Sequence, residues 1–263
     1  MRELENKNIV ITGASSGIGE KIAMLTAEKG ARPILIARSV DKLEKISGRI
    51  KKETGADCFV YSLDVSDIEQ VKKVFKQIRE EVGPIDVLLN NAGFGVFDTL
   101  QDAKYADLEN MFAVNVMGVI ACTKEALPSM LERNKGHIIN VASQAGKLAT
   151  PKSSGYAASK HAVLGFTNSI RLELMNTNIR VSTVNPGPIE TNFFAIADKS
   201  GNYVKNVKKY MLNADEVAEK VTKLMIRPKR ELNLPWWMNT GSVLYNLFPS
   251  IGEKLFGNKF NMK

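Results

Sequence analysis

The chain has 263 residues, 44% of them hydrophobic, and a formal net charge of +8. Such a chain can bury a sizeable core, and α/β folds of this size often form one domain. It contains no run of the ~20 apolar residues that a membrane-spanning helix requires, and its N-terminal MRELENKNIV lacks the apolar core of a signal peptide. We therefore expect a single cytoplasmic domain over residues 1–263.

The positive charge is concentrated near the C-terminus. Residues 201–263 hold 11 Lys or Arg against 5 Asp or Glu, a net +6 that leaves +2 for the first 200 residues. An anionic cofactor or substrate accounts for this charge, and the chain shows no nucleic-acid motif, so we predict no nucleic-acid partner. Cys58 and Cys122 are too few for a disulfide framework and have no metal-ligand spacing to His137 or His161. We predict two buried thiols and no metal.

Short apolar runs alternate with helical patterns along the chain. The runs that predict strands are Asn8–Thr12, Pro33–Ala37, Cys58–Ser62, Val87–Asn90, His137–Val141 and Val181–Val184. This alternation predicts a parallel sheet with right-handed crossovers and helices on both faces. The fold class is therefore doubly wound α/β, and ligands should bind beyond the carboxyl ends of the strands.

The segment TGASSGIG, from Thr12 to Gly19, lies between the first predicted strand and a helical pattern. Gly13, Gly17 and Gly19 in such a turn allow positive φ and the close approach of a pyrophosphate, while the helix N-terminus offers free N–H groups and a partial positive charge. The spacing G-x-x-x-G-x-G differs from the better-known G-x-G-x-x-G. It is the strand-to-helix context that predicts a dinucleotide phosphate site.

The second predicted strand ends in Ile36-Ala37-Arg38-Ser39. An acidic residue at this point, about 20 positions past the glycines, would bind the ribose 2′-hydroxyl of NAD. Ala37 exerts no repulsion on a 2′-phosphate, and the planar guanidinium of Arg38 suits one. The pattern favours NADP(H), although Arg38 alone is equally consistent with a solvated residue after a strand.

Polar side chains follow the later strands. Asn90–Gly93 ends the fourth predicted strand and by itself would be an ordinary turn. Ser143 follows the fifth, where a serine can also cap a helix. Tyr156 and Lys160 begin a helical pattern, in which residues four apart share a face. An ammonium beside a phenol lowers the phenol pKa from about 10 and makes tyrosine a usable general acid or base.

Together these residues resemble the short-chain dehydrogenases and reductases, over about residues 5–195. The resemblance implies a single Rossmann-type domain, NADP(H) as cofactor, and a small-molecule substrate with a carbonyl or alcohol group. It also implies a catalytic tetrad of Asn115, Ser143, Tyr156 and Lys160. In that scheme Tyr156 donates a proton, Ser143 holds the carbonyl oxygen, Lys160 lowers the tyrosine pKa and holds the nicotinamide ribose, and Asn115 positions a relay water.

The resemblance implies further cofactor contacts in four places: the glycine turn, an adenine-contacting pair, a nicotinamide-side strand end and a carboxamide-contacting loop. With Arg38, Tyr156 and Lys160, these residues are Gly13, Ser15, Ser16, Gly17, Ile18, Gly19, Asp64, Val65, Asn91, Ala92, Gly93, Pro186, Gly187, Ile189 and Thr191.

The loop from Thr191 to Asn213 should border the substrate. Its side chains favour a hydrophobic ketone or aldehyde, although aromatic residues also often just cover a core; they are Phe193, Phe194, Ile196, Tyr203 and Tyr210. A catalytically idle NADP-binding regulator or scaffold is the alternative class of function. The intact tetrad argues against it, because neither Tyr156 nor Lys160 is needed merely to hold the fold.

Residues 228–263 form a divergent basic and aromatic extension of the domain. Many members of the family end in a strand and an Asp-Gly-Gly turn at a tetramer contact, whereas this chain reads RELNLPWW over Arg230–Trp237. We therefore expect a homo-oligomer in which a dimer is favoured over a tetramer.

No charged residue lies between Leu232 and Gly252, and a short helix is expected around Trp237–Phe248. Pro235 and Pro249 argue against a membrane-spanning helix. The aromatic residues could cap the substrate pocket, contact a second subunit, or lie in a membrane interface with lysines near the headgroups; these are Lys254, Lys259 and Lys263. Packing within the protein or in a dimer ranks first, and peripheral membrane contact second.

Overall fold

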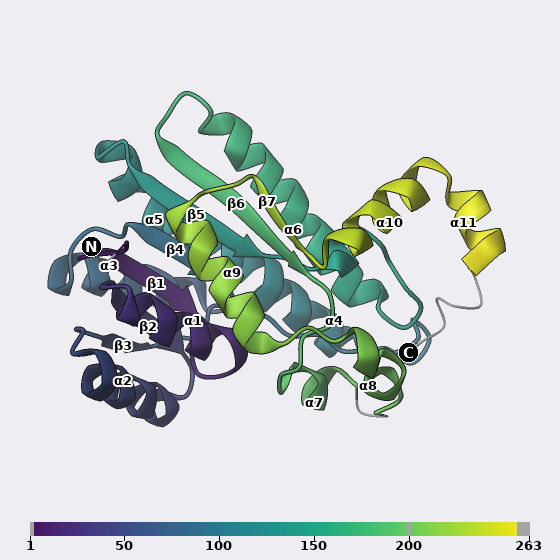
Figure 1. Cartoon of the computed structure of the whole chain (residues 1–263), viewed down its shortest axis with the longest axis horizontal. Helices are drawn as coiled ribbons and strands as arrows, with labels where there is room; N and C mark the ends of the chain where they lie inside the picture. Colours follow the sequence, from purple (N-terminus) through teal and green to yellow (C-terminus); the bar gives the residue numbers. More distant parts are fainter. Residues whose placement is uncertain (1–2, 199–200, 257–263) are drawn as a thin grey trace.

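A computed structural model describes residues 3–198 and 201–256, which include a seven-stranded sheet (Figure 1). The strands lie in the order β3-β2-β1-β4-β5-β6-β7, and every neighbouring pair is parallel. They are β1 (Asn8–Thr12), β2 (Arg32–Ala37), β3 (Phe59–Ser62), β4 (Val87–Asn90), β5 (Gly136–Val141), β6 (Ile179–Pro186) and β7 (Glu231–Leu234). The predicted doubly wound α/β fold is confirmed.

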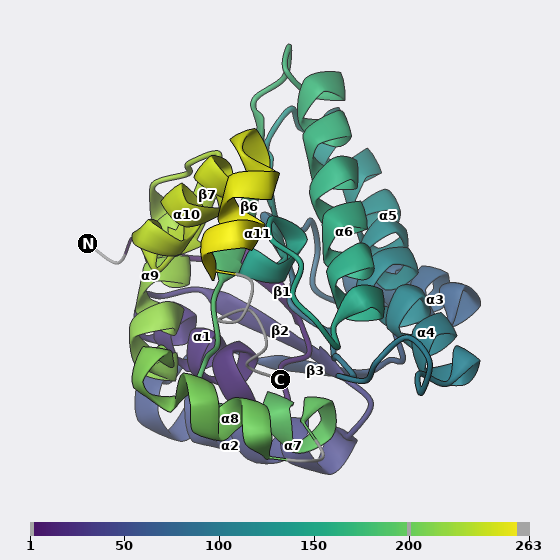
Figure 2. The ribbon, with the colours of Figure 1, turned by 90° about the vertical axis from the view of Figure 1, so that its right-hand side faces the viewer.

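Helices cover both faces of the sheet (Figure 2). One face is covered by α1 (Gly17–Glu28), α2 (Val40–Thr54) and α9 (Ala214–Ile226), and the other by α3 (Ile68–Glu81), α5 (Val119–Glu132) and α6 (Ser154–Glu173). In β1, Ile9 and Ile11 pack into the first core and Val10 into the second. Because both faces are buried, the strand reads as a continuous apolar run, as expected for a parallel sheet.

The strand order reverses between β1 and β4, so their connections leave the sheet in opposite directions. In open α/β sheets this switch point, at the carboxyl ends of the strands, is where ligands bind. The shorter elements are α4 (Tyr105–Phe112), the π-helical turn η1 (Ala113–Gly118), η2 (Gln144–Gly146), α7 (Phe193–Ala197), α8 (Asn202–Val207), η3 (Lys208–Tyr210), α10 (Trp236–Leu247) and α11 (Pro249–Phe256). Of these, α4, α7 and α8 lie near the edge formed by the carboxyl ends of the strands, whereas α10 and α11 project from it (Figure 1).

From the sequence, RELNLPWW was expected to replace both the last strand and the turn that many family members have, and the structure differs from this. The strand is present, because β7 pairs with β6 from Thr183↔Glu231 to Pro186↔Leu234. Only the turn after it departs from the family pattern, since Pro235 leads directly into α10. The expected helix around Trp237–Phe248 corresponds to α10.

The two thiols lie in different surroundings. Cys122 is buried in α5, as expected, whereas Cys58 is only half-buried and lies just before β3 rather than within it. Within the described residues, no group of three or more His, Cys, Asp or Glu could hold a metal ion. One helical stretch of that same part, Tyr105–Glu132, is long and apolar enough to cross a membrane, and half of its most apolar part is buried in the fold.

Candidate active site

The glycine turn connects β1 to α1 and packs directly against the end of β4. Gly13 and Gly17 have φ of +67° and +60°, in the region that side chains disfavour. A Cβ on Gly13 would lie 2.9 Å from Ala92 Cα, and one on Gly19 would lie 2.5 Å from the Gly13 carbonyl oxygen. The turn therefore requires glycine both for its conformation and for its packing.

Hydrogen bonds fix the two strand ends to each other. Thr12 Oγ1 accepts from the backbone N–H groups of Asn91 and Ala92, at 3.0 Å each. Asn91 Nδ2 donates to the carbonyl oxygens of Thr12 and Gly13 at 2.9 and 3.2 Å. The Asn91 side chain is thus engaged in holding the turn in place.

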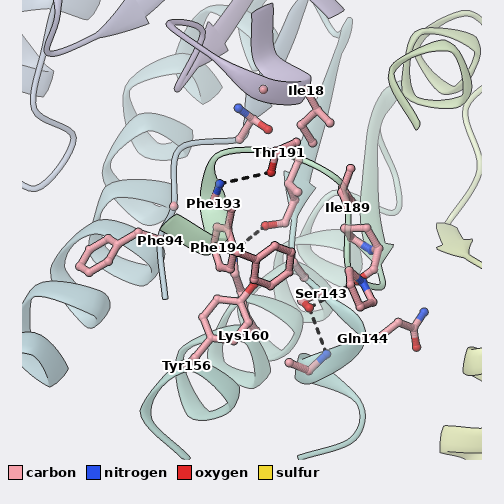
Figure 3. Close-up of a pocket in the computed structure, with 18 of the residues that line it drawn as sticks. Ile18, Phe94, Ser143, Gln144, Tyr156, Lys160, Ile189, Thr191, Phe193 and Phe194 are labelled. Atoms are coloured by element: carbon pink, nitrogen blue, oxygen red, sulfur yellow. Dashed lines mark hydrogen bonds between the residues drawn. The ribbon is translucent and has the colours of Figure 1, made fainter. Parts of the chain in front are cut away.

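A cavity of about 1510 Å³ lies beyond these strand ends and collects most of the predicted site (Figure 3). All predicted cofactor contacts line it except Gly19, which packs behind the turn. Of the predicted catalytic residues, Ser143, Tyr156 and Lys160 line the cavity and Asn115 does not.

Tyr156 and Lys160 lie one turn apart near the start of α6, and both are buried. Lys160 Nζ lies 5.8 Å from the centre of the Tyr156 ring and donates a 2.9 Å hydrogen bond to the Val141 carbonyl. Burial raises the pKa of Tyr156 to about 12, against the lowering effect of a hydrogen bond with Ser143. Burial also lowers the pKa of Lys160 to about 8.

The expectation that Lys160 lowers the tyrosine pKa is therefore not met in this arrangement. The ammonium is directed to the Val141 carbonyl, and loss of solvent around the phenol outweighs the effect of Ser143. In this state Tyr156 is a protonated phenol at neutral pH, and so a proton donor.

Ser143 follows β5 and combines two local roles. Its Oγ accepts from the backbone N–H of Ala145 at 3.1 Å, which caps η2, and donates to the Pro186 carbonyl at 3.4 Å. The capping role and the position at the cavity therefore coexist. The bond to Pro186 also ties this loop to the predicted carboxamide-contacting segment.

Asn115 lies within η1 and is completely buried. Its Oδ1 accepts from the Phe94 N–H at 3.0 Å, while its Nδ2 donates to the Phe94 carbonyl at 2.9 Å and to Ser159 Oγ at 3.0 Å. A Cβ on Gly93 would lie 3.0 Å from Asn115 Oδ1 and 3.4 Å from Lys160 Nζ. Asn115 thus fixes the loop after β4 from behind the cavity, in a π-helical turn of the kind that often marks functional sites.

Arg38 follows β2 and lines the cavity, as do Asp64 and Val65. Its side chain is 79% exposed, with a guanidinium nitrogen 3.8 Å from Asp64 Oδ2. Ser39 and Lys42 line the same cavity. Sequence reasoning missed both, although their place at the start of α2, directly after Arg38, was a usable signal.

Aromatic side chains form the wall beside Tyr156. The predicted loop residues Phe193, Phe194, Ile196, Tyr203 and Tyr210 all line the cavity. Sequence reasoning missed Phe97, whose ring lies 6.0 Å from that of Tyr156 and 5.2 Å from that of Tyr203. The tail completes the wall with Trp237, Met238, Gly241, Leu244, Tyr245, Phe248 and Ile251. Of the roles considered for the tail, capping this cavity is one the structure supports.

Lys147 joins the tail to the loop that carries Ser143. Its Nζ lies 2.5 Å from Glu231 Oε2 and 2.7 Å from Asn239 Oδ1. Glu231 also accepts from Asn233 Nδ2 at 3.2 Å. Although burial acts to raise it, the pKa of Glu231 is lowered overall by the hydrogen bond and charge of Lys147.

Replacing Lys147 by methionine should destabilise the fold by about 1–2 kcal/mol, because Glu231 would lose its partner in a half-buried place. The ion pair stabilises the fold above the unfolded Glu pKa of about 4.3, and that stabilisation is lost as pH falls through the lower folded pKa. Melting curves from pH 7 down to pH 3 should therefore converge for the two proteins. Lys72→Met, which breaks the exposed pair with Glu69, is the control and should not change the curves. Equal melts of Lys147→Met and wild type at pH 7 would contradict this assignment.

Comparison with known proteins identifies the family. The sequence pattern of the short chain dehydrogenases matches residues 7–200, and the chain belongs to this family. An NADP-dependent 3-hydroxy acid dehydrogenase of Schizosaccharomyces pombe is 35% identical over 226 residues, which cover 83% of this chain and 86% of that one.

Solved structures agree with this assignment. An alcohol dehydrogenase from the archaeon Thermococcus sibiricus, complexed with 5-hydroxy-NADP, is 33% identical with a TM-score of 0.79, and the match covers 88% of this chain and 96% of that one. A short chain dehydrogenase/reductase from Burkholderia phymatum, in complex with NAD, is 26% identical with a TM-score of 0.87, and the match covers 95% and 96%. These similarities show that the chain is an oxidoreductase of this family. Its structural neighbours include one complexed with 5-hydroxy-NADP and one complexed with NAD.

Proposed function

We propose that the protein is an NADP(H)-dependent oxidoreductase that interconverts a carbonyl group and an alcohol on an apolar substrate. One observation carries this proposal: a single cavity joins the glycine turn to Tyr156, Ser143 and an aromatic wall. The turn fits a dinucleotide, since Gly13 and Gly17 bring bare backbone to the cavity at a helix N-terminus suited to phosphate.

When bound, NADP(H) supplies or accepts the hydride. Tyr156 then provides the proton for the substrate oxygen in the direction of reduction, since its raised pKa keeps the phenol protonated. The Ser143 hydroxyl, which donates to the Pro186 carbonyl in this arrangement, would turn to donate to the same oxygen. Lys160, which donates to the Val141 carbonyl in this arrangement, is expected to hold the nicotinamide ribose.

The preference for NADP(H) is proposed from the residues that follow β2 and line the cavity. Arg38 and Lys42 are cationic, and Ser39 adds a hydroxyl at the start of a helix. These groups suit a 2′-phosphate. The names of the fission-yeast and Thermococcus relatives point to the same dinucleotide, whereas the Burkholderia neighbour holds NAD.

NADPH should bind at least about tenfold more tightly than NADH, a difference of about 1.4 kcal/mol, and Arg38→Asp should abolish that difference. Fluorescence titration with both cofactors measures it. Lys45→Asp makes the same change of charge on the exposed side of α2, away from the cavity, and should keep the preference. An Arg38→Asp protein that still prefers NADPH would show that Arg38 does not recognise the 2′-phosphate.

A panel of carbonyl compounds, followed by NADPH absorbance, tests the proposed reaction. Turnover should rise from short polar ketones to aldehydes and ketones with larger apolar groups, because the wall around Tyr156 is aromatic. NADPH binding without turnover of any compound would instead support the idle regulator. The cytoplasmic location and the homo-oligomer, with a dimer favoured, stay predictions.

A further inference from the structure

Three polar residues of helix α10 contact the body of the protein or are buried against it, whereas Thr240 is exposed. Asn239 accepts a hydrogen bond from Lys147 Nζ at 2.7 Å, and Asn246 Nδ2 donates to the Lys147 carbonyl at 3.3 Å. Ser242, between them, is 1% exposed. A surface helix of a globular protein normally has the opposite arrangement, with its apolar side on the core. The polar side of α10 is therefore satisfied within the fold, and its apolar side is not.

The apolar residues of α10 form two adjacent stripes. The first includes Trp237 and Leu244 and lines the cavity of the candidate active site. The second, which we call the outer stripe, consists of Trp236, Val243 and Leu247; their spacing of i, i+7 and i+11 places them on one helix face. They are 74%, 50% and 64% exposed, and none of the three lines the cavity. Substrate binding therefore does not explain the outer stripe.

The outer stripe lies where the chain projects from the body of the protein. Figure 1 shows α10 and α11 standing away from the sheet as a helical hairpin. Phe248 and Ile251, at the turn and in α11, also line the cavity, yet they are 57% and 58% exposed and extend the apolar surface. Exposed apolar patches of this kind mark sites of interaction.

Two lysines lie beside the cavity-lining stripe of α10, and α11 carries Lys254 next to the equally exposed Glu253. The Tyr210 ring lies 6.3 Å from the Trp237 ring, which brings the exposed Lys208 and Lys209 of η3 beside the start of α10. Lys254 is exposed on α11. Lys259 and Lys263, also considered for headgroup contact, lie outside the described residues.

This distribution of charge favours an anionic bilayer over a second copy of the chain. The described residues of η3, α10 and α11 include three lysines (Lys208, Lys209 and Lys254) and one acidic residue, Glu253, so two copies that meet here would bring like charges together. An anionic lipid surface attracts the same lysines, at about 1 kcal/mol for each one near the surface. Tryptophan side chains are also enriched at the membrane–water interface.

We propose that the α10–α11 hairpin binds the surface of an anionic lipid bilayer, with the outer stripe in the interface and the neighbouring lysines at the headgroups. The 12 residues of α10 are too few to span a bilayer core, which needs about 20. The hairpin therefore lies in the interface plane. This reverses the ranking reached from sequence, because that ranking assumed that the tail aromatics are covered by protein.

The two tryptophans of the chain are Trp236 and Trp237, so intrinsic fluorescence reports directly on the hairpin. The full chain is mixed with phosphatidylcholine vesicles, with or without about one third phosphatidylglycerol. We expect a blue shift and co-flotation with the anionic vesicles, and much less with phosphatidylcholine alone. Binding should weaken by at least about tenfold between low and high salt, because lysine–lipid attraction is screened.

Matched variants separate membrane binding from general effects of charge. Leu247→Glu should lower vesicle binding by about tenfold or more, whereas Leu172→Glu, on α6 and 66% exposed, should not. Lys208→Glu with Lys209→Glu should have a similar effect to Leu247→Glu, and Lys51→Glu with Lys52→Glu on α2 should bind like wild type. Thermal melts confirm that each variant is folded. Leu247 and these lysines do not line the cavity, so turnover of a water-soluble carbonyl compound should be unchanged.

Three results would overturn the proposal. One is the absence of flotation and blue shift with anionic vesicles at low salt. Another is equal loss of binding in Leu247→Glu and Leu172→Glu. The third is a concentration-dependent dimer in light scattering that Leu247→Glu dissociates while vesicle binding is absent, which would assign the surface to a second copy. None of these results bears on the cofactor or on the proposed reaction.

Discussion

Tyr156→Phe is expected to lower kcat by at least about a hundredfold while NADPH affinity stays within about twofold. The substitution removes only the hydroxyl, so the ring keeps its edge contacts with Phe97 and Phe193 at 6.0 and 5.7 Å. Proton donation is lost, whereas little ground-state binding depends on the oxygen. Steady-state kinetics on a verified substrate and a separate cofactor titration distinguish the two quantities.

Two companion variants make this test specific. Tyr210→Phe removes a hydroxyl elsewhere on the cavity wall and should keep most of the turnover. Lys160→Ala should reduce both turnover and cofactor affinity, because Lys160 lies beside the Tyr156 ring and is expected to hold the nicotinamide ribose. A Tyr156→Phe enzyme that retains about half of the wild-type kcat would exclude Tyr156 as the principal acid.

The central fold was predictable because its strands carry a strong local signal. Val87–Asn90 and Asn8–Thr12 are buried along their whole length, so they appear in the sequence as short apolar runs. β7 gives no such signal. Its Glu231 and Asn233 bond to Lys147 and Asn185, side chains that only the folded sheet brings near.

The candidate site was predictable as a set of residues but not as a set of contacts. Helical spacing indicated that Tyr156 and Lys160 share a face, and the structure brings them together at the cavity. The spacing could not show that the Lys160 ammonium donates to the Val141 carbonyl. Nor could it show that burial has the largest effect on the pKa of Tyr156.

The tail shows the limit of composition as a guide. The sequence around Trp237 predicted a helix and an apolar surface, and both are present. The direction of that surface depends on Asn239 and Asn246, which bind Lys147 about 100 positions earlier in the chain. A helix whose amides face inward can be recognised only once its partner is in place.

Gly19→Ala should disrupt the cofactor site, because the added methyl group has no room in the turn. The new Cβ would lie 2.5 Å from the Gly13 carbonyl oxygen and 2.7 Å from Asn91 Nδ2. The first of these is backbone, and the second side chain is held by Thr12 and Gly13, so neither can yield without opening the turn. We expect a loss of about 1–3 kcal/mol in stability, typical of overpacking, and a fall in NADPH affinity of at least about tenfold.

The matched control is Gly48→Ala, in the middle of α2, where a Cβ would meet no atom within 4 Å. Alanine favours helix over glycine by up to about 1 kcal/mol, so this variant should melt at or above the wild-type temperature and bind NADPH normally. Thermal melts and cofactor titrations of both variants test the pair. Because Gly19 packs behind the turn without lining the cavity, a lower NADPH affinity in Gly19→Ala must arise through the position of Gly13 and Asn91. Wild-type affinity in that variant would mean that the contact between β1 and β4 ends does not shape the phosphate cradle.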